Sequence, residues 1–286
     1  GKPMTKKATI RDVAREAGVS VATVSYVLNN RPNQKISDDT KKKVLQIANL
    51  LQYSPSFAAK QLTTGKSNII GIQIGRYALR NTDHYDLINV LIELLLQKGY
   101  STIFLPPIKG DMLEPQPNID GIICLDLSQR EFELLSNNYL VPIVCSDMIV
   151  NHYLFFQIYS DFSALPEKLA DFPNYTVLSA RPHNENYADF LAESLKGHIC
   201  FCDNAQMLFG HIRQTPPPYV TLGEYLSLCA LLSVPKKNVL PVLSAASYDF
   251  PVTPFYRIDL APKASKLIDA MFDAMARSPV DHDIRV

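Results

Sequence analysis

The first 53 residues show the hydrophobic spacing of short amphipathic helices. In the first of these, apolar residues recur at i, i+3, i+4 and i+7. These positions are Ile10, Val13, Ala14 and Ala17. Thr9 precedes them as a good N-cap, and Asp12 stands where half of a capping box would be. Gly18 supplies the backbone freedom for a tight turn, so a helix that ends at this turn is predicted.

Two more helices are predicted after the turn. Ser20 caps the second, which runs to about Asn29. Ser37 caps the third, whose first turn carries two aspartates that the helix dipole favours. The inward positions are Val24, Val27 and Leu28 in the second helix, and Val44, Ile47, Ala48 and Leu51 in the third. A helix, a short glycine-containing turn and a second helix form the helix-turn-helix arrangement.

The outward face of the second helix is small, polar and mostly uncharged. It carries Ala22, Tyr26 and Asn29, flanked by Val21 and Ser25. A face of this kind fits the major groove of DNA and predicts sequence-specific binding. The alternative interpretation is a generic three-helix bundle whose second helix is merely exposed.

Charge is divided unevenly between the two parts of the chain. Residues 1–67 contain 12 Lys and Arg but only 4 Asp and Glu, a net charge of +8. Because the whole chain is neutral, the remaining residues carry −8. A basic head favours contact with DNA phosphates, and an acidic body discourages nonspecific binding to nucleic acid.

A fourth, very short helix is predicted after the bundle. Ser54 caps it, Pro55 occupies its first position, and Gly65 ends it. Isolated helices need about 12–15 residues to be stable in water. This helix is therefore expected to form only when something else holds it, with Leu62 near its exposed end.

After residue 67 the pattern changes to apolar runs that alternate with amphipathic segments. Strands are predicted at 69–74, 101–105, 121–125 and 141–145, and more faintly near 155–159, 175–179, 198–202 and 239–243. Helices are predicted at 83–98, near 128–137 and at 262–277, whereas four prolines between residues 106 and 117 leave little room for one. Alternating strands and helices predict parallel sheets.

Residues 9–65 resemble the head and hinge of the LacI/GalR (lactose-repressor) family of bacterial transcription regulators. The matching strings are TIRDVA, AGVSVATVS, VLN, LLQYSP and AAKQLTTG. The resemblance implies an all-α helix-turn-helix head plus hinge helix that binds a palindromic double-stranded DNA operator as a homodimer. It also implies hinge helices paired in the minor groove, with Leu62 wedged into the central base step. The predicted DNA contacts are Thr9, Ser20, Val21, Ala22, Thr23, Ser25, Tyr26, Asn29, Ser37, Thr40, Tyr53, Ser56, Ala59, Lys60 and Leu62.

Two residues depart from the pattern of this family. Tyr26 stands where the family usually has an Arg that reads guanine bidentately. Tyrosine donates one hydrogen bond and packs on a thymine methyl, but it cannot form that fork, so a different base preference is expected. Ser56 replaces the common Asn after the hinge proline and can still contact a phosphate.

The order of elements after residue 67 resembles the periplasmic-binding-protein-like sensor domain of the same family, an α/β domain of two lobes with parallel sheets. After a DNA-binding domain at 1–53 and a linker at 54–66, lobe one is expected at about 67–158 and 256–277, and lobe two at about 159–255. The resemblance implies a cleft for a small-molecule effector of the sugar or nucleobase class. The expected effector contacts are Asp161, Arg181, Asp203 and Asp249. Each of these is alternatively a solvated residue at a strand end.

Other kinds of chemistry are not indicated. Gly65-Lys66-Ser67 looks like the end of a phosphate loop, but no strand precedes it. Metal-ligand spacing and a Ser/His/Asp arrangement are absent, so no catalytic residue, cofactor or metal is predicted. Four of the five cysteines lie in apolar runs, typical of a reducing compartment. The chain also lacks an apolar signal segment and the ~18 apolar residues of a membrane helix, so a cytoplasmic protein that does not contact membranes is expected.

Two functional hypotheses remain. In the first, the chain is a homodimeric, or tetrameric, repressor of transcription whose operator binding is modulated by a small-molecule effector. In the second, it binds DNA in the same way, but its body holds no small molecule and serves dimerisation or a protein co-regulator. An enzyme with a regulatory head is disfavoured because no catalytic arrangement is recognisable.

Overall fold

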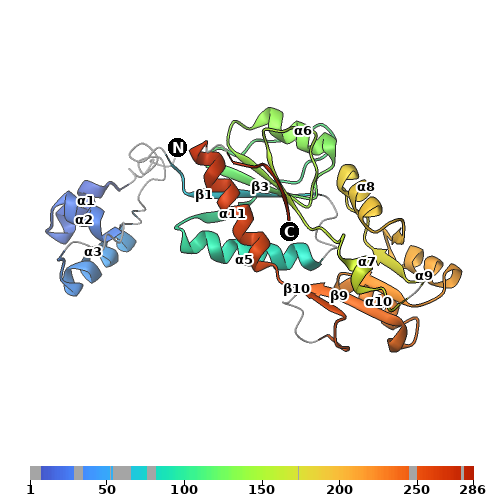
Figure 1. The fold of residues 1–286 in the computed structure, drawn as a ribbon. Helices are drawn as coiled ribbons and strands as arrows, with labels where there is room; N and C mark the ends of the chain where they lie inside the picture. Colours follow the sequence, from blue (N-terminus) through green and yellow to red (C-terminus); the bar gives the residue numbers. More distant parts are fainter. Residues whose placement is uncertain are drawn as a thin grey trace, which may run out of the picture. The chain divides into compact units, whose positions relative to one another are not determined.

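The computed structural model of the chain describes residues 8–28, 35–51, 53, 66–75, 82–172, 174–244, 250–277 and 280–286. It divides into two compact units, residues 1–67 and 68–286, which we name the head and the body (Figure 1). The predicted hinge helix lies outside the described residues. The same holds for Asn29, Ser56, Ala59, Lys60, Leu62 and Asp249.

The described part of the head consists of three helices around one small hydrophobic core. They are α1 (Ile10–Ala17), α2 (Val21–Leu28) and α3 (Asp38–Leu50). The predicted inward stripes are confirmed, since the buried core is formed by Val13, Ala14, Ala17, Val24, Val44 and Ala48. Core volume is therefore limited, and each buried side chain accounts for a large share of it.

The helix ends in the head follow from the capping residues. The Thr9 N–H donates to Asp12 Oδ2 at 2.9 Å, and the Asp12 N–H donates to Thr9 Oγ1 at 3.4 Å, which completes a capping box. Gly18 ends α1 with a φ of 69°, the left-handed conformation that glycine adopts without strain. Ser37 Oγ accepts a hydrogen bond from the Thr40 N–H at 3.2 Å at the start of α3.

The body contains two parallel sheets, and the first defines lobe one. Among the described residues its strand order is β2-β1-β3-β4-β5-β11. The strands are β1 (Ile69–Ile74), β2 (Ser101–Phe104), β3 (Gly121–Leu125), β4 (Ile143–Ser146), β5 (Phe156–Tyr159) and β11 (Asp283–Arg285). Helices α5 (Thr82–Gln97) and α11 (Ala261–Ala276) pack together on one face of this sheet (Figure 1). Helix α6 (Gln129–Asn138) packs on the opposite face.

The second sheet defines lobe two. Among the described residues its strand order is β10-β9-β8-β6-β7. The strands are β6 (Thr176–Ser179), β7 (Ile199–Phe201), β8 (Tyr219–Leu222), β9 (Val239–Ser244) and β10 (Tyr256–Ile258). The accompanying helices are α7 (Leu165–Lys168), α8 (Glu185–Ser194), α9 (Ala205–Gln214), α10 (Glu224–Leu231) and the 3-10 helix η2 (Lys236–Asn238). The prediction of an all-α head and an α/β body with parallel sheets is thus confirmed.

The structure corrects the sequence analysis at three short strands. The sequence analysis predicted none of the strands β8, β10 and β11. Tyr256 pairs with Val242 of β9, so residues 256–258 belong to lobe two and not to lobe one as expected. Ile284 of β11 pairs with Ile158, which brings the end of the described chain back to lobe one. Strands of three or four residues are too short to show a period, and pairing with a neighbour decides their place.

Candidate nucleic-acid interface and interlobe cavity

Helix α2 presents one face to the core of the head and another to solvent. Val24 is fully buried against α1 and α3, whereas Val21 and Ala22 are exposed. Tyr26 and Ser25 are partly buried. The outward residues named from the sequence therefore lie on an accessible side of α2, except Asn29, which is outside the described residues.

Pairs of hydroxyl groups mark the first turns of α2 and α3. Ser20 Oγ lies 2.9 Å from Thr23 Oγ1 and accepts the Thr23 N–H at 3.0 Å. Ser37 Oγ lies 2.8 Å from Thr40 Oγ1 in the same arrangement. Hydroxyl groups and backbone N–H groups at helix N-termini are frequent donors to DNA phosphates. The geometry suits these four residues for positioning contacts.

Tyr53 has a structural contact in addition to its predicted contact with DNA. Its ring is half-buried against the core of the head, and its N–H donates to the Ala48 carbonyl at 2.8 Å. Burial raises the pKa of the Tyr53 hydroxyl. Tyr53 therefore ties the chain that leaves α3 to the helical bundle.

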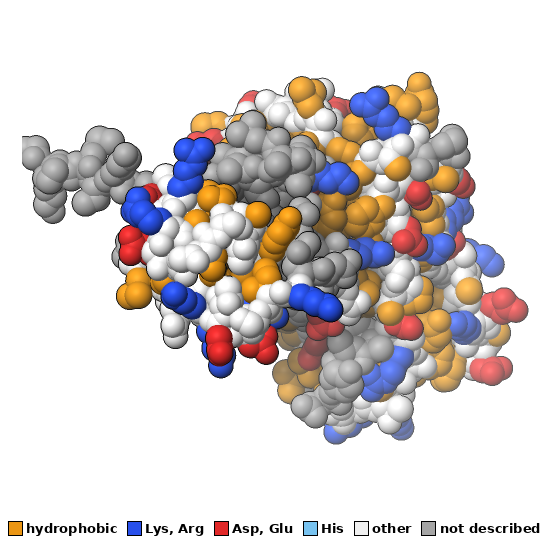
Figure 2. Space-filling view, turned by 90° about the vertical axis from the view of Figure 1, so that its left-hand side faces the viewer, with side chains coloured by type: hydrophobic (Ala, Val, Ile, Leu, Met, Phe, Trp, Pro, Cys, Tyr) orange, Lys and Arg blue, Asp and Glu red, His pale blue; other side chains and the backbone are white. Residues whose placement is uncertain are grey.

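The charged side chains of the head that the structure describes lie at its surface. Arg15 pairs with Asp12 at 3.1 Å and with Glu16 at 3.4 Å, while Lys41 pairs with Asp38 at 3.2 Å. In the view of Figure 2, Lys and Arg side chains are scattered among exposed hydrophobic ones. Exposed ion pairs contribute little to stability, so these groups are available for interaction with a charged partner.

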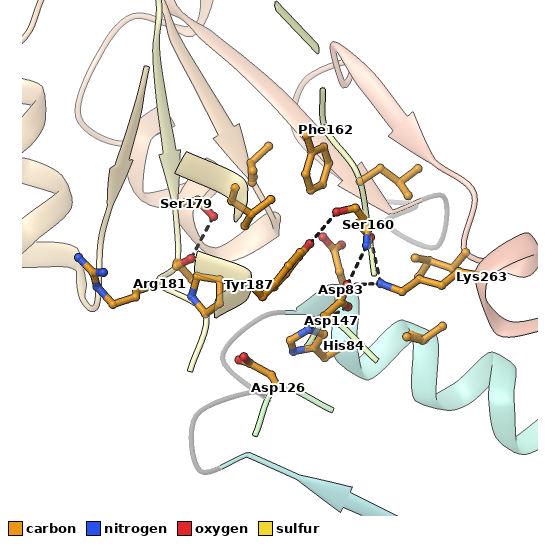
Figure 3. A pocket seen from close by; sticks show the side chains of 17 residues that line it. Asp83, His84, Asp126, Asp147, Ser160, Phe162, Ser179, Arg181, Tyr187 and Lys263 are labelled. Carbon is orange, nitrogen blue, oxygen red and sulfur yellow. Dashed lines mark hydrogen bonds and ion pairs between the residues drawn. The ribbon is translucent and has the colours of Figure 1, made fainter. Parts of the chain in front are cut away.

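The body contains a cavity where the carboxyl ends of the strands of the two lobes meet. Its volume is about 80 Å³. Asp83 and His84 of α5 line it from lobe one, together with Asp126, Asp147 and Lys263 (Figure 3). Ligands of open α/β sheets bind at this edge, because the loops that follow the strands converge there.

Asp147 is the centre of a buried ion network in lobe one. Lys263 of α11 donates to Asp147 Oδ1 and, at 2.9 Å, to Ser160 Oγ. His84 Nε2 lies 3.3 Å from Asp147 Oδ2. Burial opposes ionisation of Asp147, but the Lys263 charge and the His84 hydrogen bond hold its pKa below the usual range. Burial also disfavours the charged form of His84, yet its hydrogen bond to Asp147 leaves the His84 pKa raised.

Two other carboxyl groups, those of Asp83 and Asp126, line the cavity in a different setting. Burial raises the pKa of Asp83 and of Asp126 to about 6 in each case. Asp126 Oδ1 accepts hydrogen bonds from the His183 N–H at 2.7 Å and from the Asn184 N–H at 3.0 Å, at the start of α8. A lobe-one carboxylate thus occupies the N-terminus of a lobe-two helix, a position that favours negative charge.

The expected effector contacts do not converge among the described residues. Arg181 lines the cavity, but its guanidinium points away from Asp83 and Lys263 (Figure 3), over the ring of Phe201 at 4.8 Å. Asp203 lies 3.9 Å from Arg181 and does not line the cavity.

Asp161 does not line the cavity either, and its Oδ1 accepts the Ser163 N–H at 2.8 Å. Residues of both lobes line the cavity. Apart from Arg181, its charged and histidine side chains come from lobe one and were not selected in the sequence analysis: Asp83, His84, Asp126, Asp147 and Lys263.

A signal for some of the missed residues was present in the sequence. Asp126 and Asp147 directly follow β3 and β4, which pair in parallel through Cys124 and Cys145. Aspartates at the ends of neighbouring parallel strands meet at one edge of the sheet. His84 and Lys263 gave no such signal, because each lies on a helix and is 63 or more residues from its partner Asp147.

The described residues contain no group of three or more His, Cys, Asp or Glu side chains that could hold a metal ion. Within the same residues, no helix is both long and apolar enough to cross a membrane.

Comparison with known proteins agrees with the two-part architecture. The model of the family "bacterial regulatory proteins, lacI family" matches residues 9–56. The HTH-type transcriptional repressor PurR of Histophilus somni (strain 129Pt) is 34% identical over 152 residues, which cover 49% of this chain and 44% of the relative. The HTH-type transcriptional regulator GalS of Salmonella typhimurium is 53% identical over 66 residues, 23% of this chain and 19% of the relative. The chain spans less than half the length of the curated relatives it matches.

Solved structures share the fold of the chain at low sequence identity. A lac repressor dimer bound to operator and the anti-inducer ONPF has a TM-score of 0.70 at 17% identity, over 98% of this chain and 96% of that one. A complex of the transcriptional regulator CelR with cellobiose has a TM-score of 0.58 at 13% identity, over 98% of this chain and 96% of that one. Residues 9–56 thus match the lacI family of bacterial regulatory proteins, and the chain as a whole shares the fold of the lac repressor.

Proposed function

We propose that the chain is a sequence-specific DNA-binding regulator of transcription that acts as a repressor. The observation that carries this proposal is the orientation of α2. Val24 fixes the helix to the core, while Val21, Ala22 and Tyr26 remain accessible for base contacts. The paired hydroxyl groups at the starts of α2 and α3 support phosphate contacts beside them.

The operator is proposed to be palindromic and to be bound by a homodimer. One recognition helix per chain reads one half-site, so two-fold symmetry of the protein requires two-fold symmetry of the site. The short helix predicted at 54–65 would be stabilised by its copy in the partner subunit and by the minor groove.

Selection of bound sites from a random DNA pool tests this proposal directly. The expected result is a site with dyad symmetry, bound by two chains. Affinity is expected to fall with salt, with a slope of about −0.9 per phosphate neutralised, because the head carries the basic charge. Selected sites without dyad symmetry, or full affinity for a single chain, would contradict the homodimer.

Leu62 is proposed as the side chain that opens the central base step. Leu62→Ala is expected to reduce both DNA bending and specific affinity, because a wedge needs a side chain of this size. Leu45→Ala is the matched control, since Leu45 is exposed on α3 and outside the predicted contacts. Equal bending by the wild type and Leu62→Ala would remove the wedge from the mechanism.

The interlobe cavity is the proposed effector site, with a sugar or a nucleobase as the class of ligand. At about 80 Å³ it is smaller than the ~150 Å³ of a cavity that holds benzene. Binding of a sugar would therefore require the lobes to separate. The second candidate function, a body that binds no small molecule, is favoured by the polar groups of the cavity, because Asp126, Asp147 and Lys263 already pair within the chain.

Thermal denaturation with sugars, sugar phosphates and nucleobases separates the two candidates. A ligand of the folded cavity at a hundredfold excess over its dissociation constant stabilises the fold by about 2.7 kcal/mol. Stabilisation by one compound would support an effector-responsive regulator. If the whole panel leaves the unfolding temperature unchanged, the body serves dimerisation or a protein co-regulator.

A further inference from the structure

Among the described residues, several hydrogen bonds join lobe two to lobe one at the start of α8. The His183 and Asn184 N–H groups donate to Asp126 Oδ1 at 2.7 and 3.0 Å. The Asn184 side chain accepts the Ile149 N–H and donates to the Leu127 carbonyl, each at 3.0 Å. Asn184 is completely buried, so these bonds form in the interior and replace contacts with water.

A second set of contacts joins the two lobes beside the start of α8. His183 Nε2 lies 3.0 Å from Glu131 Oε2 on α6. The Gln129 N–H donates to Glu185 Oε2 at 3.1 Å, and Asn186 Nδ2 donates to the Ile149 carbonyl at 2.9 Å. The side chain of His183 is 30% exposed, so protons from solvent reach it without prior opening of the lobes.

We propose that Asp126, Glu131, His183 and Asn184 form a proton-sensitive latch that holds the two lobes closed without a ligand. The latch is tighter in mild acid than in mild alkali, and His183 is the residue whose protonation changes it most. The regulated property is the equilibrium between closed and separated lobes, which the proposed DNA binding does not by itself require.

The charges around His183 explain the direction of the effect. It faces carboxylates from three elements: Glu131 on α6, Asp126 after β3, and Glu185 on α8. A protonated imidazolium is attracted by all three, whereas a neutral ring keeps only a weaker hydrogen bond. The Glu131 hydrogen bond raises the pKa of His183 above its ordinary value of 6.5, although partial burial opposes protonation.

The sign of the linkage follows from the raised pKa of His183. Separation of the lobes exposes His183 to water and returns its pKa towards 6.5. Closure is therefore favoured fully below that value and loses this contribution as pH rises through the higher pKa of the closed state. Each unit of difference between the two pKa values changes the ratio of closed to separated lobes about tenfold.

The latch contains two other titratable groups, the carboxyl groups of Asp126 and Glu131. Burial raises the pKa of Asp126 to about 6, and the nearby charge of Asp147 adds to this effect. The charge of His84 and the hydrogen bonds from the Asn184 and His183 N–H groups act in the opposite direction. Glu131 is partly buried, but its hydrogen bond from His183 leaves its pKa lowered, so it titrates at more acidic pH.

Distances between spin labels on the two lobes test the latch in the full chain. Labels are attached through ketone-bearing amino acids at Asn137 on α6 and Glu193 on α8, both exposed. At about pH 6 we expect a short, narrow distance distribution, and at about pH 8.5 a longer and broader one. His183→Gln should abolish this difference, whereas His211→Gln on α9 should retain it. Identical distributions of the wild type at both pH values, or an undiminished response in His183→Gln, would overturn the proposal.

Nuclear magnetic resonance of the histidine side chains provides a measurement that survives if His183→Gln fails to fold. In the wild type the pKa of His183 should lie above 6.5, and in Glu131→Gln it should fall towards that value. A pKa of His183 that is unchanged in Glu131→Gln would also overturn the latch. Because neither experiment contains DNA, failure of the latch and failure of the proposed DNA binding are separable.

Discussion

The head and the body use their charged residues in opposite ways. In the head the charged side chains lie at the surface, around a core of Val, Ala and Ile side chains. In the body, Asp147 and Lys263 are buried beside His84, between the sheet of lobe one and helices α5 and α11. An exposed functional face depends on one helix and its period, whereas a buried polar cluster depends on several elements that meet in space.

The comparisons with relatives also differ between the head and the full length of the chain. Identity reaches 53% over the 66 residues aligned with GalS, whereas the solved relatives match nearly the whole chain at 17% identity or less in the two cases above. A parallel sheet tolerates exchange among hydrophobic residues of similar volume. A face that reads DNA does not, because each outward side chain meets a particular base edge or phosphate.

The largest effect is expected from breaking the buried charge pair of the body. Lys263→Met leaves Asp147 buried without its strongest counter-charge and should destabilise the body by about 3–5 kcal/mol. Lys266→Met is the matched control on the exposed side of the same helix and should change little. Urea denaturation of both variants measures the difference, and equal stability of the two would show that the pair is not essential for folding.

A smaller loss is expected in the core of the head. Val24→Ala removes two methyl groups from a fully buried site and should destabilise the head by about 2–3 kcal/mol. Val21→Ala, on the exposed face of the same helix, should leave the stability unchanged. Hydrogen exchange of the amides in α1–α3 reports on the head separately from the body. Simultaneous loss of protection in both units would contradict their independence.

Substitution on the outward face of α2 should change the base specificity of DNA binding and leave the stability of the head unchanged. Tyr26→Arg is expected to shift the preferred base at one position of each half-site towards guanine, with a discrimination of about 1–3 kcal/mol. The site preferences of the wild type and the variant are compared by selection from the same DNA pool. Coincident preferences would mean that Tyr26 positions the helix on the backbone and does not read a base.

The smallest effect concerns the cap of α3. Ser37→Ala removes the acceptor of the Thr40 N–H and should destabilise the head by about 1 kcal/mol. Ser37→Asn retains a capping oxygen and should restore most of the loss. Thermal unfolding of the two variants gives the comparison. A stability of Ser37→Ala equal to that of Ser37→Asn would assign Ser37 to DNA contact alone.

The local signals of the chain were sufficient for the helices of the head and for most strands of the body. Thr9, Gly18 and Ser37 mark helix boundaries through hydrogen bonds within three residues, so neighbouring sequence determines them. The long apolar runs of β1 and β3 similarly indicate buried strands. The four prolines between 106 and 117 correctly predicted that no helix joins β2 to β3 among the described residues.

The sequence by itself determined the three helices of the head, the outward face of α2 and the parallel character of the body, because each depends on spacing within a short segment. Tertiary structure alone decided that β10 joins lobe two, that β11 returns to β5, and that Asp126 accepts the N–H of Asn184, the N-cap of α8. It also decided that His84 and Lys263 meet at Asp147. These contacts join residues 14 to 126 positions apart. Packing within each lobe brings most of them together, and the contact between Asp126 and Asn184 also needs the two lobes to meet.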